Sequence, residues 1–365
     1  MKEKVVVGMS GGVDSSVAAL LLKKQGYDVI GVTMQIWQEE DGCQIEENGG
    51  CCGLSAVEDA RRVADMIGIP HYVMNFREIF KEKVISNFIS EYMVGRTPNP
   101  CIVCNRFVKW EALLEKSLAI GADKIATGHY AKLVQTQSGR FAVARADSEH
   151  KDQTYALYSL TQDQLSRTLF PLGEYDKPQI RRIAQDAGLI VAGKPDSQDI
   201  CFVPDGDYQA FIEKETGHHA KPGEFVDKEG RRIGRHKGIS AYTIGQRKGL
   251  NLAMGHPVYV IGLDTEKNQV IIGENEDLFH TTLKASHINC MALASFERPV
   301  KLVGKIRYNH KGAPCTAVQT GEDKLTVTFD EPQRAITPGQ ALVLYDGKCV
   351  AGGGIIEGIA GVSCD

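Results

Sequence analysis

"KVVVGMSGGVDSS", residues 4–16, contains an apolar run of strand length, then a glycine pair, then a cluster of small polar side chains. Three consecutive valines are typical of a buried strand, and the apolar residues after Ser16 continue at helical spacing. The glycines at 11 and 12 let backbone N–H groups approach a ligand, and a helix that begins near Val13 turns its positive dipole end toward the same loop. The stretch therefore predicts a phosphate-binding turn between a strand and a helix.

This turn differs from two common nucleotide loops. It has neither the Gly-Lys-Ser/Thr of the Walker loop nor the three-glycine spacing of the dinucleotide fingerprint. The plain alternative is a glycine turn that only connects strand to helix. Ser10, Asp14, Ser15 and Ser16 lie within the same few residues, which favours a pyrophosphate cradle.

Around this turn, residues 1–204 alternate apolar strands with helical patterns. A helical pattern over residues 55–68 opens with a capping box, Ser55 with Glu58, and stops at Gly68. A second begins with Asp176 as its cap and Pro178 in its first turn. The strand candidates are residues 4–9, 28–36, 71–76 and 123–130. This alternation predicts an α/β domain with a doubly wound parallel sheet.

From residue 205 onward the pattern changes to short alternating runs between Gly, Asn, Asp and Pro turns, which is typical of β structure. Such runs occupy residues 256–264, 300–308, 324–329 and 340–345. We expect three domains: the α/β domain over 1–204, a small β-rich central domain over 205–283 and a C-terminal β-barrel over 284–365.

Composition limits the setting. The chain has 365 residues, 42% of them hydrophobic, and a formal net charge of −4. That charge excludes a uniformly basic surface, so nucleic-acid binding would need local patches. Lys and Arg cluster at residues 231–238, 245–250 and 300–312, in the β-rich part. The sequence shows no signal peptide and no apolar stretch of membrane-spanning length, so we expect a cytoplasmic protein without membrane partners.

Ten cysteines are scattered along the chain. In a reducing compartment they are expected to be thiols. Cys101 and Cys104, in "TPNPCIVCN", have the spacing that metal sites and redox dithiols share, but no second pair follows that would complete a four-cysteine zinc site. The pair must act alone or recruit one distant cysteine.

The remaining cysteines outside Cys201 carry weaker signals. Cys43, Cys51 and Cys52 lie in a glycine-rich segment, where a flexible loop with incidental thiols is favoured over metal binding. A structural role is expected for the cysteines at no metal-ligand spacing, which are Cys290, Cys315, Cys349 and Cys364.

A family resemblance covers nearly the whole chain. The motifs "SGGVDS", "GRTPNPCIVCN", "ATGHYA", "KDQTYALYSL", "DSQDICF", "GQRKGL" and "TPGQALVLY" together resemble the bacterial tRNA-specific 2-thiouridylases of the PP-loop ATP pyrophosphatase superfamily. The resemblance implies 2-thiolation of the wobble uridine in tRNAs of the Lys, Glu and Gln type. It also implies ATP with Mg²⁺, and sulfur handed on by a cysteine desulfurase or a sulfur-relay protein.

The chemistry of that reaction fits the motifs. The C2 oxygen of uracil is a poor leaving group, whereas an adenylated oxygen departs as AMP. A cysteine persulfide supplies sulfur in a nucleophilic and transferable form. The resemblance assigns the persulfide to Cys201 and the second catalytic thiol to Cys104, which would close a disulfide with Cys201. On its own, a cysteine in "DICFV" is more often a small core residue.

The resemblance also implies the ligand-binding residues. Met34 would otherwise be core filler, and a lone histidine such as His129 is more often structural. The ATP-binding positions implied are Gly8, Met9, Ser10, Gly11, Gly12, Val13, Asp14, Ser15, Met34 and Gly128. The tRNA-binding positions implied are Asn99, Pro100, Cys101, His129, Lys151, Asp152, Gln153, Arg307, Tyr308 and Gln340.

Cys101 departs from the family pattern, because many relatives carry aspartate there. A thiol orients a base or transfers a proton poorly at neutral pH. Three thiols, Cys101, Cys104 and Cys201, would instead suit three irons of a four-iron cluster whose fourth iron holds sulfide. A persulfide and disulfide mechanism and a three-cysteine zinc site compete with this hypothesis.

Two other functions stay open from the sequence. One is another PP-loop enzyme that adenylates a small carboxylate or amide. The other is a nucleotide- and metal-binding regulator without turnover.

Overall fold

The computed structural model describes residues 2–36, 54–147, 151–195, 200–203 and 206–360. The chain divides into two compact units. The first unit comprises residues 1–85, 100–206 and 348–350, and the second unit comprises residues 86–99, 207–347 and 351–365.

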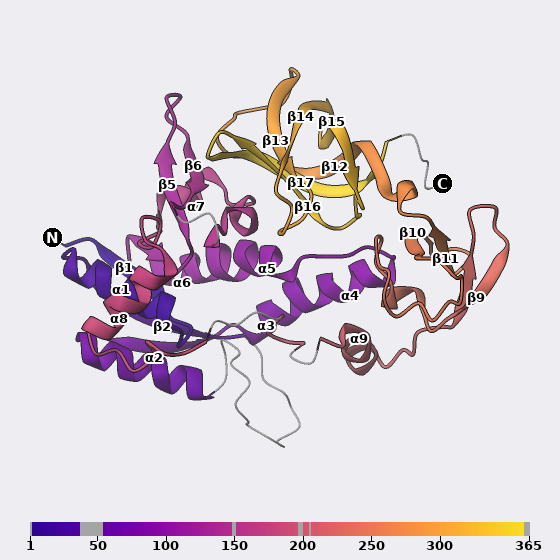
Figure 1. The fold of residues 1–365 in the computed structure, drawn as a ribbon. Helices are drawn as coiled ribbons and strands as arrows, with labels where there is room; N and C mark the ends of the chain where they lie inside the picture. The colour runs from indigo at the N-terminus through magenta and orange to yellow at the C-terminus, as the bar shows by residue number, and fades with distance from the viewer. Residues whose placement is uncertain (1, 37–53, 148–150, 196–199, 204–205, 361–365) are drawn as a thin grey trace. The chain divides into compact units, whose positions relative to one another are not determined.

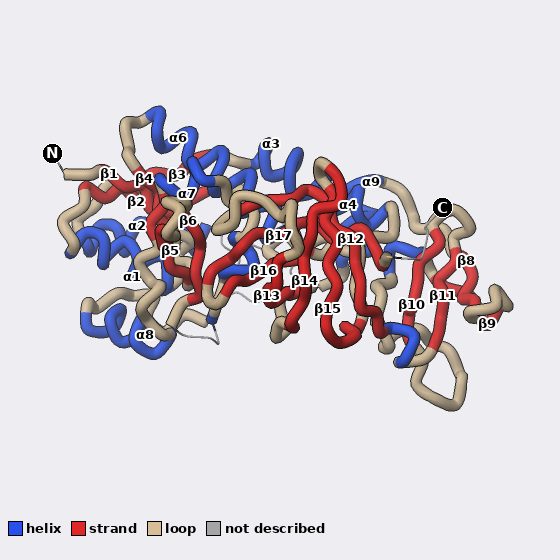
Figure 2. Tube along the Cα trace, turned by 90° about the horizontal axis from the view of Figure 1, so that it is seen from above, coloured by secondary structure: helices blue, strands red, loops and turns tan. Residues whose placement is uncertain are grey.

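The first unit is built on a five-stranded sheet in the order β3-β2-β1-β4-β7, with every neighbouring pair parallel (Figures 1 and 2). Helix α1 packs against both α2 and α8. One apolar core joins these helices to the sheet. The strands are β1 (Lys4–Gly8), β2 (Asp28–Gln35), β3 (His71–Asn75), β4 (Lys124–Ala126) and β7 (Thr168–Leu169), and the helices are α1 (Val13–Lys24), α2 (Leu54–Ile67) and α8 (Lys177–Asp186). The doubly wound parallel sheet predicted from the sequence is confirmed.

Local signals predicted several helix ends. Helix α8 has the expected cap: Asp176 Oδ1 accepts a hydrogen bond from Gln179 N at 2.8 Å, and Gln179 Oε1 accepts one from Asp176 N at 2.8 Å. Gly68 follows α2 with a φ of +67°. The capping box at Ser55 was wrong, because α2 already includes Leu54 and Ser55 lies inside its first turn.

Two π-helical segments, η1 (Phe80–Ile85) and η2 (Cys104–Ala112), occur in the first unit. A π-turn is wider than an α-turn and is often found at functional sites. Asn105 Nδ2 donates to Ala156 O at 2.9 Å, and the buried Trp110 donates through Nε1 to Thr168 Oγ1 at 2.8 Å. These bonds fix both ends of η2. The unit also contains α3 (Arg77–Ile79), α5 (Pro100–Val103), α6 (Leu113–Ala119), β5 (Ala131–Gln135), β6 (Phe141–Arg145), η4 (Thr154–Leu157) and α7 (Gln162–Ser166).

The second unit contains two β structures with separate cores. A four-stranded sheet has the order β10-β11-β8-β9, and six strands in the order β12-β15-β14-β13-β16-β17 close into a barrel through pairing of β12 with β17 (Figure 2). The β-rich central region and the C-terminal barrel are thus confirmed. The strands are β8 (Gly223–Val226), β9 (Arg232–His236), β10 (Tyr259–Asp264), β11 (Gln269–Gly273), β12 (Phe279–Cys290), β13 (Val300–Lys305), β14 (Ala313–Gly321), β15 (Lys324–Arg334), β16 (Ala341–Asp346) and β17 (Cys349–Ile359).

The short helices of the second unit are α4 (Ser86–Met93), α9 (Tyr208–Thr216), η5 (Ile239–Ala241) and η6 (Glu276–Leu278). Within the part of the chain that the structure describes, no helix combines the length and apolar character needed to cross a membrane.

Candidate nucleotide and thiol site

The predicted phosphate turn lies between Gly8, the last residue of β1, and Val13, the first residue of α1. Its own serines shape it: Ser15 Oγ accepts from Ser10 N at 3.1 Å, and Ser16 Oγ donates to Gly12 O at 2.8 Å. Among the described residues, no side chain caps the start of α1. The first N–H groups of this helix are therefore open to an anion, and phosphate binding by the turn stays a prediction.

Close backbone packing explains the glycine at position 11. Gly11 has a φ of +69°, and a Cβ there would lie 2.3 Å from Ala56 O of α2. A side chain at this position would push the turn away from α2. The glycine is needed for the shape of the turn as well as for ligand access.

Gly128 follows β4 and approaches the same turn. A Cβ at Gly128 would lie 2.7 Å from Ser15 N. Met34, in β2, places its Cε 3.9 Å from the Cβ position of Gly8. The structure thus brings Gly8, Met34 and Gly128 together at the carboxyl edge of the parallel strands, where ligands of open α/β sheets bind.

Asp14 is held by two side chains that the sequence analysis missed. Tyr130 OH donates to Asp14 Oδ1 at 2.7 Å, and Lys177 Nζ donates to both carboxylate oxygens at 2.8 Å. Lys177 opens α8, and its side chain is 12% exposed. The sequence could have placed Lys177 at the start of α8, because it follows the correctly predicted cap Asp176. Only the fold shows that its side chain contacts Asp14.

A second missed lysine lies at the other side of the turn. Lys194 Nζ donates to Gly11 O at 3.2 Å and pairs with Asp59 Oδ2 at 2.9 Å. Arg181 fixes the backbone around Lys194, because it donates hydrogen bonds to Ala192 O at 3.0 Å and to Lys194 O at 3.1 Å. The turn itself contains no basic residue. The ammonium groups of Lys177 and Lys194 therefore bring positive charge beside the predicted phosphate turn.

The three cysteines of interest all lie in the first unit. Cys101 is an exposed residue of α5, Cys104 is the half-buried first residue of η2, and Cys201 is exposed. Phe202 packs edge-on against Phe80 of η1, with ring centroids 5.6 Å apart. Since η1 also contacts α5 and η2, the three segments that carry the thiols all pack against η1.

The thiols do not form a ready metal centre. Over the described residues, no group of three or more His, Cys, Asp or Glu side chains could hold a metal ion. Burial raises the pKa of Cys315 to about 12, which agrees with a structural thiol. Cys290 and Cys349 are half-buried. The four remaining cysteines, Cys43, Cys51, Cys52 and Cys364, lie outside the described residues.

The predicted RNA contacts near β4 also have structural roles. His129 Nδ1 lies 2.7 Å from Thr127 Oγ1, and burial, with Lys109 nearby, holds the pKa of this imidazole well below its usual value. A neutral ring can offer a ligand a hydrogen bond but no charge. Gln153 Oε1 accepts from Tyr130 N at 2.9 Å. Asp152 accepts from Thr154 N at 3.1 Å, and the neighbouring Lys151 is half-buried.

The other predicted RNA contacts lie in the second unit, except Pro100 and Cys101. Arg307 Nη1 donates to Arg334 O at 2.9 Å, and Tyr308 is 44% exposed. Gln340 Nε2 donates to Thr97 O at 2.8 Å, two residues before Asn99. Gln340 is thus engaged with the chain that leads into the thiol segment.

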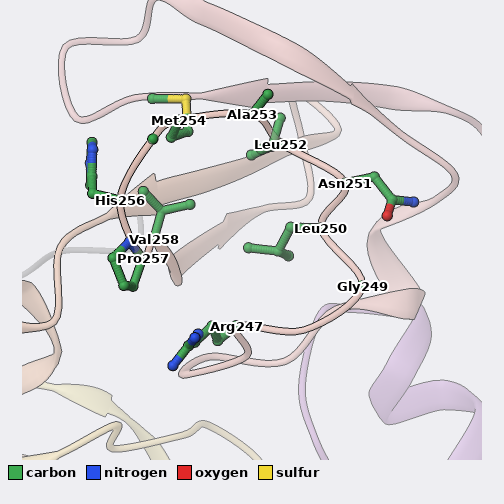
Figure 3. Close-up of a pocket in the computed structure, with 11 residues that line it drawn as sticks. Arg247, Gly249, Leu250, Asn251, Leu252, Ala253, Met254, His256, Pro257 and Val258 are labelled. Atoms are coloured by element: carbon green, nitrogen blue, oxygen red, sulfur yellow. The ribbon is translucent and has the colours of Figure 1, made fainter.

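A hollow of about 450 Å³ lies elsewhere in the second unit, lined by Arg247 and residues 249–258 (Figure 3). Its lining includes the apolar side chains of Leu250 and Met254 and the polar side chains of Arg247 and His256. His256 Nε2 lies 2.9 Å from Glu274 Oε1. None of the residues implied by the resemblance lines this hollow of the described chain.

Sequence comparisons agree with the geometry. Family models match the chain as a tRNA methyl transferase HUP domain over residues 3–205, a tRNA methyl transferase PRC-barrel domain over 209–274 and an aminomethyltransferase beta-barrel domain over 280–356. A parallel α/β sheet with this turn and these thiols defines an ATP-using PP-loop protein.

Relatives identify the family within that class. The chain is 60% identical over 354 residues to the tRNA-specific 2-thiouridylase MnmA of Lachnoclostridium phytofermentans, covering 97% of this chain and 99% of that protein. It is 54% identical over 358 residues to the protein of the same name in Clostridioides difficile, covering 98% and 99%. The chain belongs to the tRNA-specific 2-thiouridylase family.

Likeness to solved structures is weaker. A 4-thiouridine synthetase in complex with RNA and bound ATP matches with a TM-score of 0.37 and 19% identity, over 59% of this chain and 50% of that chain.

Proposed function

We propose that this chain is a tRNA-uridine 2-sulfurtransferase, which uses ATP to replace the C2 oxygen of the wobble uridine with sulfur in tRNAs of the Lys, Glu and Gln type. The observation that carries the proposal is a phosphate turn flanked by Lys177 and Lys194 in the same compact unit as Cys104 and Cys201. Two family models carry a methyl transferase label, but methyl transfer needs neither an adenylated oxygen nor a thiol pair.

The first step is activation. The C2 oxygen of uracil attacks the α-phosphorus of ATP, which forms an adenylated uridine and releases pyrophosphate. Charge builds on the leaving pyrophosphate, and the ammonium groups beside Asp14 and Gly11 are placed to neutralise it. Mg²⁺ would accompany the nucleotide and add positive charge, with Asp14 as the carboxylate of the turn that suits it.

The second step is sulfur transfer. The terminal sulfur of a Cys201 persulfide attacks C2, and AMP leaves with the oxygen. Cys104 thiolate then attacks the Sγ of Cys201. The bond between Cys201 Sγ and the transferred sulfur breaks. That sulfur stays on C2 of the base, and a Cys104–Cys201 disulfide forms. An external thiol reductant restores both cysteines, and a cysteine desulfurase or relay protein reloads Cys201.

An iron–sulfur cluster on Cys101, Cys104 and Cys201 stays a prediction, and the steps above do not depend on it. Anaerobic reconstitution followed by iron and sulfide analysis tests it. Iron-free protein that is fully active with a persulfide donor, and that tolerates Cys101→Ala, would exclude the cluster.

The remaining assignments follow from the same proposal. We keep three domains over residues 1–204, 205–283 and 284–365, and a cytoplasmic location, where tRNA is modified. The ATP site is proposed to consist of Gly8 to Ser15 with Met34 and Gly128. The proposed tRNA contacts are Asn99, Pro100, Cys101, His129, Lys151, Asp152, Gln153, Arg307, Tyr308 and Gln340.

Thionucleoside analysis of tRNA tests the function. We expect a deletion strain to lack 2-thiouridine at the wobble position and the purified protein with ATP and a sulfur donor to restore it. Pyrophosphate exchange driven by a small carboxylate or amide without tRNA would point to another PP-loop enzyme. Nucleotide binding without any turnover would point to a regulator.

A further inference from the structure

A threonine in the second strand of the parallel sheet holds the residue that opens the phosphate turn. Thr33, in β2, is fully buried, and its Oγ1 donates to Met9 O at 2.9 Å. Met9 N donates to Val32 O at 2.8 Å. Both polar backbone groups of Met9 are therefore bound by β2.

The bond to Met9 O also sets the direction of the next N–H group. A trans peptide is planar, so its C=O and N–H point in opposite directions. Met9 O points toward Thr33, and Ser10 N on the same peptide donates to Ser15 Oγ at 3.1 Å. Thr33 therefore fixes the peptide between Met9 and Ser10, from which the predicted phosphate turn begins.

A histidine in the third strand supports the same hydroxyl. His71, the first residue of β3, places its Nε2 2.8 Å from Thr33 Oγ1. A hydroxyl has one proton, and Thr33 gives it to Met9 O, so His71 Nε2 must carry a proton and donate it. Burial, with Arg61 nearby, lowers the pKa of His71, which favours the neutral ring. His71 Nδ1 has no hydrogen-bond partner among the described residues, so the ring is held through Nε2.

Close packing around Gly31 leaves this arrangement little freedom. Gly31 pairs with Val7 of β1 on one side and with His71 of β3 on the other. A Cβ at Gly31 would lie 2.6 Å from Met9 Sδ and 3.3 Å from His71 Cδ2. Met9 and His71 thus pack over the same glycine of β2.

We propose that Thr33 and His71 are positioning residues for the nucleotide, which fix the peptide between Met9 and Ser10 and so set the affinity of the phosphate turn for ATP. Thr33 acts through Met9, and His71 acts through Thr33. The inference rests on the proposed function, because it takes this turn as the ATP site.

Thr33→Val tests the proposal, because it keeps the shape of the side chain and removes the hydroxyl. Met9 O and His71 Nε2 then both lose their partner. We expect the Kd for ATP with Mg²⁺, measured by calorimetry without tRNA, to rise about tenfold, as the loss of a buried hydrogen bond would cause. Thr33→Ser keeps the hydroxyl and should stay within about twofold of wild type.

Thr168→Val is the matched control for stability. Thr168 is a buried threonine in β7 of the same sheet, and its Oγ1 donates to Gln164 O at 2.6 Å and accepts from Trp110 Nε1 at 2.8 Å. Both valine variants should lower the urea midpoint by a similar amount, because each removes a hydroxyl between a carbonyl and a ring N–H. Only Thr33→Val should raise the Kd for ATP.

His71 gives an independent pair of variants. His71→Leu removes the donor to Thr33 and should raise the Kd for ATP about threefold or more. His71→Gln keeps an N–H donor at the end of a side chain of similar reach and should recover most of this loss. If Thr33→Val does not fold, these two variants provide the same comparison.

The kinetics of tRNA-dependent pyrophosphate release separate nucleotide positioning from the chemical step. A turn that binds ATP less well in both the ground state and the transition state changes KM and leaves kcat unchanged. Thr33→Val should therefore raise the KM for ATP about tenfold and keep kcat within about twofold of wild type.

Three results would overturn the inference. They are a wild-type Kd for ATP in Thr33→Val, an equal rise in Thr33→Val and Thr168→Val, and equal effects of His71→Leu and His71→Gln. A wild-type protein that binds no ATP would refute the proposed function instead, and the inference would fall with it.

Discussion

Lys177→Met removes the ammonium group that pairs with Asp14 and leaves the aliphatic part of the side chain. Asp14 keeps the hydroxyl of Tyr130 at 2.7 Å but loses two hydrogen bonds of 2.8 Å. The carboxylate is 30% exposed, so water compensates part of the loss. We expect the free energy of unfolding to fall by about 1–2 kcal/mol, below the cost of breaking a fully buried pair.

The effect on activation should be larger. A charge-assisted hydrogen bond contributes about 1.5–3 kcal/mol, and 1.36 kcal/mol corresponds to a tenfold rate change. If Lys177 neutralises the leaving pyrophosphate, Lys177→Met should lower kcat/KM for tRNA-dependent pyrophosphate release about 10- to 150-fold. Lys177→Arg should recover part of this loss, because it keeps the charge.

The assay follows pyrophosphate release at saturating tRNA over a range of ATP concentrations. Lys132→Met is the matched control, since Lys132 forms a 2.8 Å pair with Asp147 in the same unit and should be near wild type. Tyr130→Phe removes the neutral donor to Asp14 and should cost less than Lys177→Met. Wild-type pyrophosphate release by a folded Lys177→Met protein would refute the role of this lysine.

Four further outcomes are expected. Cys201→Ser should block thiolation while tRNA-dependent pyrophosphate release continues; normal thiolation would rule out the persulfide at this residue. Gly128→Ala should weaken ATP binding about tenfold or more, because its Cβ would lie 2.7 Å from Ser15 N, whereas Gly193→Ala, with nothing within 4 Å, should not. Arg307→Gln should lower tRNA affinity and reduce the salt slope by about 0.7 to 0.9 with ATP affinity unchanged; an unchanged slope would mean that Arg307 contacts no phosphate. Burial lowers the pKa of four histidines, which are His71, His129, His236 and His310. The free energy of unfolding should therefore fall as the pH drops below about 6.5, which urea midpoints at pH 7.5 and 5.5 would measure. His129→Gln should make this fall smaller.

Sequence signals predicted those features that are set by neighbouring residues. Three valines before a glycine pair gave β1 and the phosphate turn, and Asp176 with Gln179 gave the start of α8. The barrel and the central sheet followed from short alternating strands between turn residues. In each case the sequence signal lies within a few residues along the chain, although the strand pairing in the barrel joins distant residues.

Contacts between distant residues were not accessible. Lys177 lies 163 residues from Asp14, and Lys194 lies 183 residues from Gly11, so only tertiary packing brings these charges to the turn. Gln340 and Thr97 are 243 residues apart. The wide turns of η2 were also missed, because an apolar pattern does not distinguish a π-helix from other helices. Ser55 was misplaced for the usual reason that helix ends shift by a residue or two.

The pairing of Asp14 with Lys177 has a consequence for turnover. An incoming anion must take the lysine away from a carboxylate that it already satisfies, so the anion gains only the difference between two ion pairs. We therefore expect pyrophosphate to be released readily, because Asp14 can pair with Lys177 again as the product departs. The ion pair present without ligand would then reduce inhibition of the reaction by its own by-product.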